Sequence, residues 1–375
     1  MSKMTKKKNL NIEFLRVLSM LMVVTLHALG KGDLLKSLNA DKTSMTYLAW
    51  VLESFAIVAV NVYVLISGYL LCESRFRIGR LLELCCEVWF YSIVIYVLNL
   101  FLHFSSQPLN SHTALMCVLP LNMDTYWFMT AYVVMYIFSP LLKLAAAKMS
   151  QKQFGTVVCM FAGILSVFKT VLPVTLETDR KGYDAMWFFA LFLIGAYLKK
   201  YGCPFIKKPS TGGIIYLVFC VLVFAEKWCL DFVYVKTGHL ETIQSVSYHY
   251  NHLFVLLASI GLFEWVLLAK EISKPVGKVA GFLAPMALGV YLIHEQFCVR
   301  FEWTKWLGLN SIAGSGAPAA FSALARVFGA VLCVYIVASL IDFIRIQIFN
   351  IVKKLFRNTR IVKSFAKSDG YINGD

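Results

Sequence analysis

Long apolar runs recur through almost the whole of this 375-residue chain, from Ile12 to Asn350. A run of about 20 apolar residues is long enough to cross the hydrocarbon core of a bilayer as a helix. The chain is 59% hydrophobic and only 15% charged, whereas soluble proteins carry about 25% charged residues. A soluble globular protein is therefore excluded, and so is a soluble domain with a single anchor. The pattern predicts an all-α, polytopic integral membrane bundle, because helices satisfy their own backbone hydrogen bonds in lipid.

Ten apolar runs qualify as predicted spans, of which 184–199 is the shortest. The apolar segment 111–121 is too short to span, which is typical of a re-entrant or interfacial segment. We expect a single membrane-embedded domain over residues 1–350 and a basic to polar cytoplasmic tail over 351–375, disordered from Ser364. The predicted spans are 12–30, 46–72, 79–104, 125–147, 153–175, 184–199, 211–229, 252–269, 279–298 and 319–347.

Lys and Arg residues gather in short clusters between the apolar runs. With the N-terminus in the cytoplasm, each loop on that side is basic, whereas the segment from His103 to Asp124 on the other side has no Lys or Arg. The positive-inside rule then predicts both termini in the cytoplasm and an even number of spans. The first cytoplasmic cluster consists of Lys3, Lys6, Lys7 and Lys8.

The net charge of +15 does not indicate nucleic-acid binding, because no recognisable nucleic-acid-binding module accompanies the basic clusters. Anionic lipid headgroups explain these clusters, so we expect membrane lipids and no nucleic acid among the partners. The ten cysteines are scattered without the two-residue gap of a zinc or redox motif, and we assign them no chemistry.

Three ionisable residues, Glu13, Arg16 and His27, lie within the first span. Each such residue costs about 2.5 to 3.5 kcal/mol at membrane depth, and together they argue against a cleaved signal peptide. His27 follows Arg16 by 11 residues, a spacing that returns to within about 20° of the same helix face after a rise of about 16 Å. All three therefore share one stripe. A neutral imidazole can accept and return a proton near neutral pH, which makes His27 the best general-base candidate.

A structural role is the alternative for this stripe. Glu13 and Arg16 then neutralise each other near the headgroups, and His27 forms a hydrogen bond between helices.

Two arginines stand at the start of the third predicted span, in the motif RIGR. Arg77 and Arg80 are one turn apart on a helix, and two guanidinium groups at that spacing can hold neighbouring phosphates. A topological anchor is the alternative role for both. Ser67 and Gly68 end the second span, where small residues permit close helix contact or the approach of a ligand to the backbone.

Other polar and aromatic residues are expected near the outer membrane interface. Trp127 and Tyr132 lie in the span 125–147, where an aromatic belt is the alternative to a role in the site. His294 and Glu295 are adjacent near the end of another span, and neighbours on a helix diverge by 100°, so we do not expect a preformed dyad. The remaining histidines lack convincing metal-ligand spacing, and we expect solvated loop residues and no metal site. They are His103, His112, His239, His249 and His252.

Taken in order, these segments resemble the acyltransferase-3 family, whose members are polytopic bacterial membrane proteins that O-acylate cell-surface polysaccharides. The matching segments are IEFLR with His27, NVYVLISGYLL, RIGR, WFMTAYVVMYIFSPLL, FLIGAYL and GVYLIHE. The resemblance implies a multi-pass bundle of about ten helices in the bacterial inner (plasma) membrane. It also implies an acyl-CoA donor, usually acetyl-CoA, on the cytoplasmic side, and a carbohydrate or lipid-linked glycan as acceptor.

The resemblance further implies roles for individual residues. His27 matches the essential histidine of the family and Arg16 its first-span arginine, so we expect both to be catalytic. We expect Arg77, Arg80, Ser67 and Gly68 to bind the donor. Supporting roles are expected for Glu13, Trp127, Tyr132 and His294.

One stretch, LLELCCEVWF after Arg80, departs from the family pattern, because it carries two acids and no proline. Two other functions fit the same buried charges. One is a transporter or flippase for a lipid-linked glycan, although we see no internal repeat. The other is a sensory membrane module that binds a small ligand.

Overall fold

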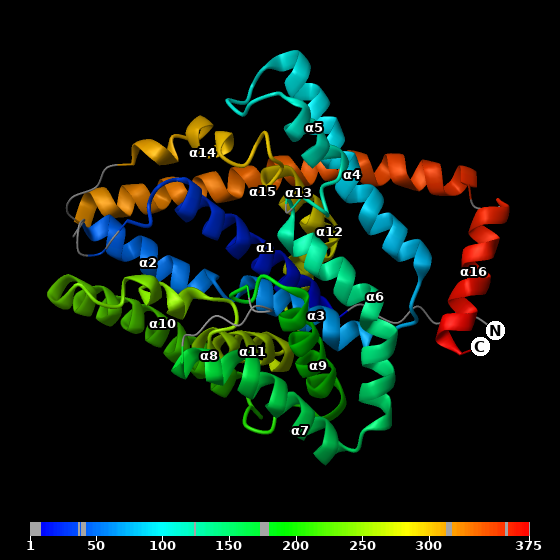
Figure 1. Cartoon of the computed structure of the whole chain (residues 1–375), viewed down its shortest axis with the longest axis horizontal. Coiled ribbons are helices and arrows are strands. Elements are labelled where there is room, and N and C mark those ends of the chain that lie inside the picture. Colours follow the sequence, from blue (N-terminus) through cyan, green and yellow to red (C-terminus); the bar gives the residue numbers. More distant parts are fainter. Residues whose placement is uncertain are drawn as a thin grey trace.

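The computed structural model describes residues 9–36, 38, 43–123, 125–172, 180–312, 317–356 and 359–374. The predicted basic cluster Lys3, Lys6, Lys7 and Lys8 lies outside the described residues. Every regular element in the described part is a helix, as predicted, and Figure 1 shows their arrangement. The α-helices are α1 (Leu10–Lys31), α2 (Ser44–Ala56), α3 (Ala59–Leu71), α4 (Ile78–Leu102), α5 (Ser111–Val118), α6 (Trp127–Lys148), α7 (Gln151–Ala162), α8 (Phe168–Val171), α9 (Ala185–Tyr201), α10 (Pro209–Thr237), α11 (Leu253–Leu268), α12 (Lys274–Leu283), α13 (Ala287–His294), α14 (Glu302–Trp306), α15 (Ala317–Phe356) and α16 (Arg360–Asn373).

Within the described ranges, nine helical segments are long and apolar enough to cross a membrane. They account for nine of the ten predicted spans, and the polytopic helical bundle is confirmed. The tenth prediction, 184–199, coincides with α9, a helix of 17 residues. Four of the nine segments are built from consecutive shorter helices: Ser44–Leu71, Gln151–Val171, Glu241–Leu268 and Lys274–His294.

Local sequence explains where several helices begin. The Asn9 side chain accepts hydrogen bonds from the first turn of α1, and Asp184 does the same for α9. Ser150 and Gln153 form a reciprocal capping box at the start of α7. Such caps satisfy backbone N–H groups that have no partner inside the helix.

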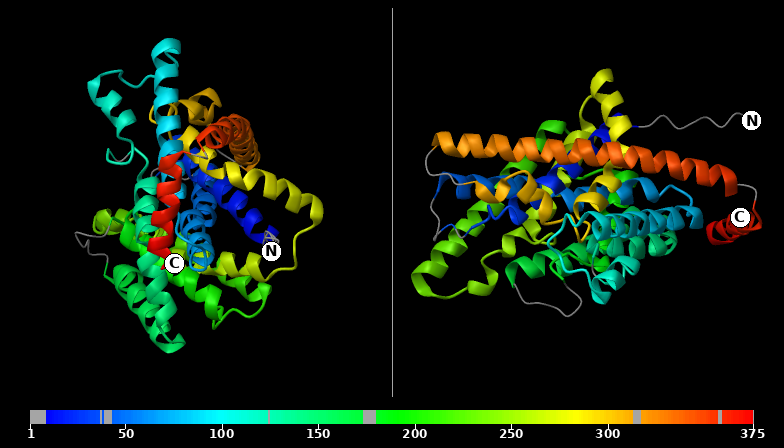
Figure 2. Two further views of the ribbon diagram at one scale, coloured as in Figure 1. Left: turned by 90° about the vertical axis from the view of Figure 1, so that its right-hand side faces the viewer. Right: turned by 90° about the horizontal axis from the view of Figure 1, so that it is seen from above.

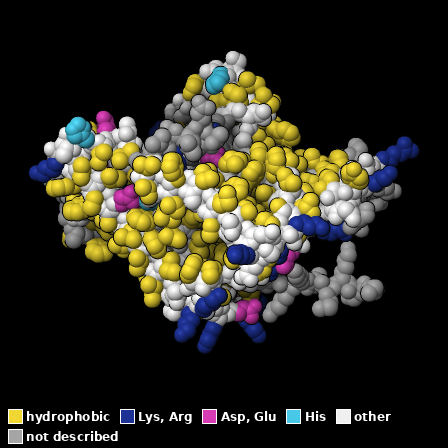
Figure 3. Space-filling view, turned by 60° about the horizontal axis from the view of Figure 1, so that its bottom comes forward, with side chains coloured by type: hydrophobic (Ala, Val, Ile, Leu, Met, Phe, Trp, Pro, Cys, Tyr) yellow, Lys and Arg dark blue, Asp and Glu magenta, His cyan; other side chains and the backbone are white. Residues whose placement is uncertain are grey.

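The surface agrees with a protein surrounded by lipid. Figure 3 shows hydrophobic side chains spread broadly over one face, with Lys and Arg gathered toward its margins. Many of the exposed side chains on α4, α10 and α15 are large and apolar, including Leu98, Val221 and Leu340. In a soluble protein exposed apolar surface is limited to patches of a few hundred Å², so this surface indicates contact with acyl chains.

The interior is organised around α1 and α3. Val24, Ala28 and Leu29 of α1 are fully buried, and α1 packs against α2, α3, α12, α13 and α15. Figures 1 and 2 show α15 running along the outside of the bundle and α16 lying at one end of the molecule beside the start of α4. The central position of α1 places its polar stripe inside the protein.

Helices α3 and α9 approach each other closely through glycine. A Cβ atom on Gly68 would lie 2.4 Å from the Phe192 carbonyl oxygen, and one on Gly195 would lie 2.5 Å from the Leu65 carbonyl oxygen. Only glycine permits such backbone contact without a shift of the helices. Gly68 therefore has a packing role here, whereas the sequence also allowed it a place beside a ligand.

The prediction of disorder from Ser364 is wrong. Residues 360–373 form α16, which begins at the Thr359 cap. Asp369 Oδ1 accepts a hydrogen bond from the Ile78 backbone N–H (2.7 Å), and Asn373 pairs with both the N–H and the carbonyl of Phe76. The chain end is thus joined to the segment that precedes α4. In addition, α15 continues to Phe356, beyond the predicted domain boundary at residue 350.

Candidate active site

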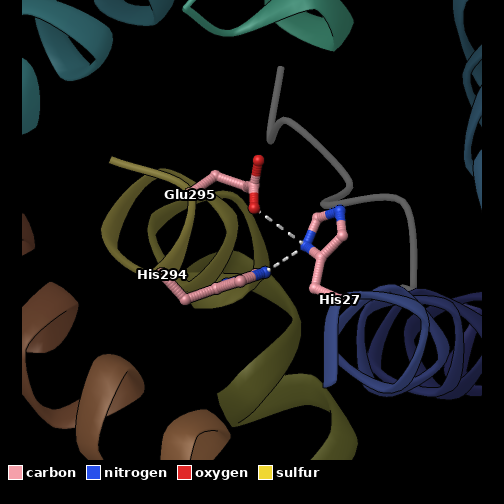
Figure 4. Close-up of side chains that lie close together, drawn as sticks. All are labelled: His27, His294 and Glu295. Carbon is pink, nitrogen blue, oxygen red and sulfur yellow. Dashed lines mark hydrogen bonds and ion pairs between the residues drawn. The ribbon is translucent and has the colours of Figure 1, made fainter. Parts of the chain in front are cut away.

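The polar stripe of α1 meets the end of α13 at His27. His27 Nδ1 lies 2.8 Å from His294 Nε2 and 3.3 Å from Glu295 Oε1. Figure 4 shows the two side chains from the end of α13 pointing toward the ring from α1. His294 and Glu295 are buried, and His27 is partly exposed. Tyr126 donates a hydrogen bond to the Leu292 carbonyl and helps to hold this end of α13 in place (3.0 Å).

The hydrogen bonds fix the protonation of both rings. His294 Nδ1 is 2.6 Å from the Val290 carbonyl oxygen, which can only accept, so this nitrogen must carry the proton. The Nε2 atom of a neutral His294 is then an acceptor, and His27 Nδ1 must donate to it. In a neutral His27 ring the remaining nitrogen, Nε2, therefore has a free lone pair. This is the tautomer that a general base needs.

Glu295 connects the histidines to a cation. Its Oε1 atom lies 3.3 Å from His27 Nδ1, which is an ion-pair distance when the ring is protonated, and it also forms an ion pair with Lys31 Nζ. Lys31 is the last residue of α1, one turn beyond His27. A carboxylate beside Nδ1 stabilises an imidazolium that forms when Nε2 takes up a proton.

His27, His294 and Glu295 also have the residue types of a metal site, with ligand atoms within 4.8 Å of one another. The 2.8 Å separation of the two ring nitrogens is that of a hydrogen bond. Two nitrogens bound to one tetrahedral zinc at about 2.0 to 2.1 Å would lie farther apart. The arrangement is thus that of a hydrogen-bonded acid–base group.

Two neighbouring cavities in the bundle share part of their lining. One, of about 30 Å³, is lined by His27 together with Trp127 and Tyr250, and it has room for one or two water-sized groups. The other, of about 150 Å³, is lined by Arg16, Arg80, Ser67 and Tyr132. The residues that line both cavities and stand between them are Tyr63, Phe128 and Leu288.

The two RIGR arginines differ in position. Arg80 lies in the first turn of α4 and lines the larger cavity. Arg77 is exposed and is not among the described residues that line this cavity. The predicted common helical face is wrong, because α4 begins only at Ile78 and Arg77 precedes it with extended backbone (φ −141°, ψ 114°). The Arg77 backbone instead forms hydrogen bonds with the Tyr136 hydroxyl. Arg80 forms an exposed ion pair with Glu83 at 3.4 Å.

Several other predicted residues gather near the larger cavity. Glu13 is buried and pairs with Arg16 at 3.2 Å. The Ser67 hydroxyl lies 3.3 Å from the Tyr132 hydroxyl. Trp127 belongs to the smaller cavity on the His27 side. The structure thus places Arg16, Arg80, Ser67 and Tyr132 on one side of the shared wall, and Trp127 with His27 on the other.

The remaining histidines were predicted to be solvated, which is wrong for His252. It is 2% exposed, caps α11, and its Nε2 atom lies 3.3 Å from Glu226 Oε2. His103, His112 and His239 are exposed as predicted.

The sequence reasoning missed two members of the site. The sequence did not link Glu295 to His27. On a continuous helix Glu295 and His294 would point in directions 100° apart, so they were not expected to meet at one partner. Helix α13 ends at His294, however, and Glu295 is its cap residue with ψ −4°. Lys31 was not singled out, although a cation four residues after His27 in the same helix was a usable signal.

Comparison with protein families gives one match. A family model described as an acyltransferase domain, that of the acyltransferase-3 family, matches residues 9–342. The matched region contains His27, both cavities and every residue of the acid–base group. No curated protein and no solved structure matches the chain.

Proposed function

This chain belongs to the acyltransferase-3 family and is a membrane acyltransferase, and we propose that it is an O-acyltransferase that uses acyl-CoA. In this proposal the acyl group is acetyl, the acceptor is a hydroxyl of a cell-surface or lipid-linked carbohydrate, and the protein lies in the bacterial inner (plasma) membrane. The family match does not favour a transporter or flippase.

The observation that carries the proposal is the hydrogen bond between His27 Nδ1 and His294 Nε2. It commits the Nδ1 proton to His294, which leaves Nε2 as the basic atom of a ring that lines a cavity. A positioned histidine with a free lone pair is the usual general base for a hydroxyl nucleophile and contributes about 10²- to 10⁴-fold to the rate.

The reaction then follows from this geometry. His27 Nε2 removes the proton of the acceptor hydroxyl while the hydroxyl oxygen attacks the thioester carbonyl. The tetrahedral intermediate collapses as the C–S bond breaks, and the proton on His27 Nε2 passes to the CoA sulfur. The products are an acetyl ester and free CoA thiol, and His27 returns to its neutral state. Glu295 stabilises the imidazolium that exists between the two proton transfers.

The larger cavity supports the donor side of the proposal. Arg16 and Arg80 bring positive charge to it, as anionic phosphates require. The exposed pair of Arg80 with Glu83 is of a kind worth only about 0 to 1 kcal/mol, so a phosphate can replace the carboxylate. Arg77 would hold the nucleotide end outside.

At about 150 Å³ the cavity is smaller than the roughly 300 to 1,000 Å³ of common ligand pockets. This volume has no room for the nucleotide, so we place only part of the thin pantetheine arm in it. In the proposal the arm enters past Arg80 and Ser67, and the thioester reaches His27 at the wall formed by Tyr63, Phe128 and Leu288.

The experiment that tests this function is acetyl transfer by purified protein in detergent. Wild-type protein, His27→Ala and His27→Gln receive labelled acetyl-CoA with and without a carbohydrate acceptor. We expect both substitutions to reduce transfer by about 10²- to 10⁴-fold, and the control His239→Ala, which alters an exposed histidine, to retain it. Undiminished transfer by His27→Ala would refute the mechanism. A wild-type protein that never consumes acetyl-CoA would refute the donor.

A further inference from the structure

Three aromatic rings from separate segments pack together at the His27 cavity. Trp127 begins α6, Tyr183 precedes α9, and Tyr250 precedes α11. The ring centroids of Trp127 and Tyr183 are 4.3 Å apart, those of Tyr183 and Tyr250 are 4.8 Å apart, and Trp127 stacks on Tyr250 at 5.6 Å with planes 26° apart. We call these three residues the aromatic platform.

Buried polar contacts hold the platform in place. The Asn61 side chain donates to the Tyr250 carbonyl oxygen at 2.7 Å and accepts from the Trp187 indole N–H at 2.9 Å. Gly182 has φ +83°, and a Cβ there would lie 2.8 Å from Tyr250 Cβ. Glycine thus lets the turn that carries Tyr183 approach Tyr250 without steric conflict. Two segments far apart in sequence are fixed against each other.

The platform leads from the protein surface to His27. Trp127 and Tyr250 line the small cavity together with His27, and Tyr183 is 37% exposed. An aromatic belt at a membrane interface consists of separate rings that face the headgroups. Here three rings face one another and continue into a cavity with room for one or two water-sized groups, which corresponds to a hydroxyl rather than a whole sugar.

From this arrangement we propose that the aromatic platform is the acceptor subsite, on which a pyranose ring stacks so that one of its hydroxyls enters the cavity beside His27. The inference rests on the proposed function and names the part of the acceptor that the protein recognises. One face of a pyranose presents C–H groups with partial positive charge, which complement the negative face of an aromatic ring. Tyrosine and tryptophan also provide large contact areas at low entropic cost.

The closing experiment compares cyclic and open-chain acceptors. Methyl β-D-glucopyranoside, methyl β-D-galactopyranoside and methyl N-acetyl-β-D-glucosaminide each present a pyranose ring, whereas sorbitol carries similar hydroxyls without one. For Tyr183→Ala we expect the KM of the glycosides that the wild type accepts to rise about five- to tenfold, the scale of one lost aromatic contact. The KM for sorbitol should rise less than the KM for the glycosides, because sorbitol has no ring face that can stack. Tyr183→Phe should keep the wild-type KM, and Phe205→Ala, which removes an exposed aromatic elsewhere, serves as control.

Binding is measured separately so that this inference and the proposed function can fail independently. Saturation-transfer NMR on protein in nanodiscs reports contact with the ring protons of the same glycosides without any reaction. We expect transfer to the protons of one ring face in the wild type and its loss in Tyr183→Ala. A protein that binds glycosides in this way but consumes no acetyl-CoA would refute the function and keep the subsite. Absence of glycoside binding in the wild type, or an equal KM change for sorbitol, would overturn the subsite.

Discussion

Replacing His294 by Phe tests whether the hydrogen-bond relay at the end of α13 sets the state of His27. His294 is 1% exposed, and phenylalanine is an apolar aromatic ring of similar shape. The change removes the acceptor that lies 2.8 Å from His27 Nδ1. The Glu295 carboxylate, whose Oε1 lies 3.3 Å from the same nitrogen, remains to stabilise the protonated ring. The substitution therefore weakens His27 as a general base but does not remove its function.

The size of the effect follows from these contacts. A hydrogen bond contributes about 0.5 to 1.5 kcal/mol net, and up to about 3 kcal/mol when one partner is charged, as His27 is after it takes up the proton. Each 1.36 kcal/mol changes a rate tenfold. We therefore expect the acetyl-transfer kcat of His294→Phe to fall about tenfold to a hundredfold, and the KM for acetyl-CoA to stay near the wild-type value.

A double-mutant cycle provides the assay. Transfer of labelled acetyl groups is measured for His27→Ala, His294→Phe and the double variant, with thermal unfolding of each to check the fold. If His294 acts through His27, the double variant is no slower than His27→Ala, because the relay has nothing left to orient. Fully additive losses in correctly folded protein would refute the relay and leave His294 with a separate role.

Three further predictions follow from the packing and the charges. Arg80→Ala should raise the KM for acetyl-CoA more than Arg77→Ala does in steady-state assays, because Arg80 alone of the two lines the described cavity; equal effects would contradict this placement. Gly68→Ala should lower the free energy of unfolding, measured by thermal denaturation, by about 1 to 3 kcal/mol through overpacking against α9. Gly79→Ala should leave it unchanged, because a Cβ there meets open space. Asp369→Ala removes the acceptor of the Ile78 N–H and should raise the KM for acetyl-CoA with little change in kcat; an unaltered KM would exclude a role of α16 in positioning this segment.

The sequence predicted most of the fold, because apolar runs and bilayer thickness leave few alternatives. It also predicted the stripe of Glu13, Arg16 and His27, since helical periodicity holds along the interior of α1. Two errors arose at helix ends. Glu295 was not joined to His27, and Arg77 was expected to share a face with Arg80, because these inferences extended α13 past its last residue and α4 before its first. Regular geometry does not apply at a cap.

Other features depend on partners far away in the sequence. The chain end was predicted to be disordered from its polar composition, but the contacts that secure α16 join Asn373 to Phe76. Gly68 was ambiguous for the same reason, since the Phe192 carbonyl that explains it lies on another helix. The aromatic platform combines residues from three segments, and no single motif contains them. Local propensity carries no information about such contacts.

Arg16 and His27 line different cavities, and the proposed reaction gives this separation a meaning. In the proposed reaction the donor is anionic and the acceptor is a sugar, and the arginines and the aromatic platform lie on opposite sides of Tyr63, Phe128 and Leu288. A base that must meet both substrates has to stand at this wall, about 16 Å along α1 from the arginine. A guanidinium next to His27 would add to the positive charge that Lys31 already brings to this site and would oppose protonation of His27 Nε2. The spacing within α1 thus keeps the positive charge of Arg16 away from the base. In the proposal the pantetheine arm spans the distance between Arg16 and His27.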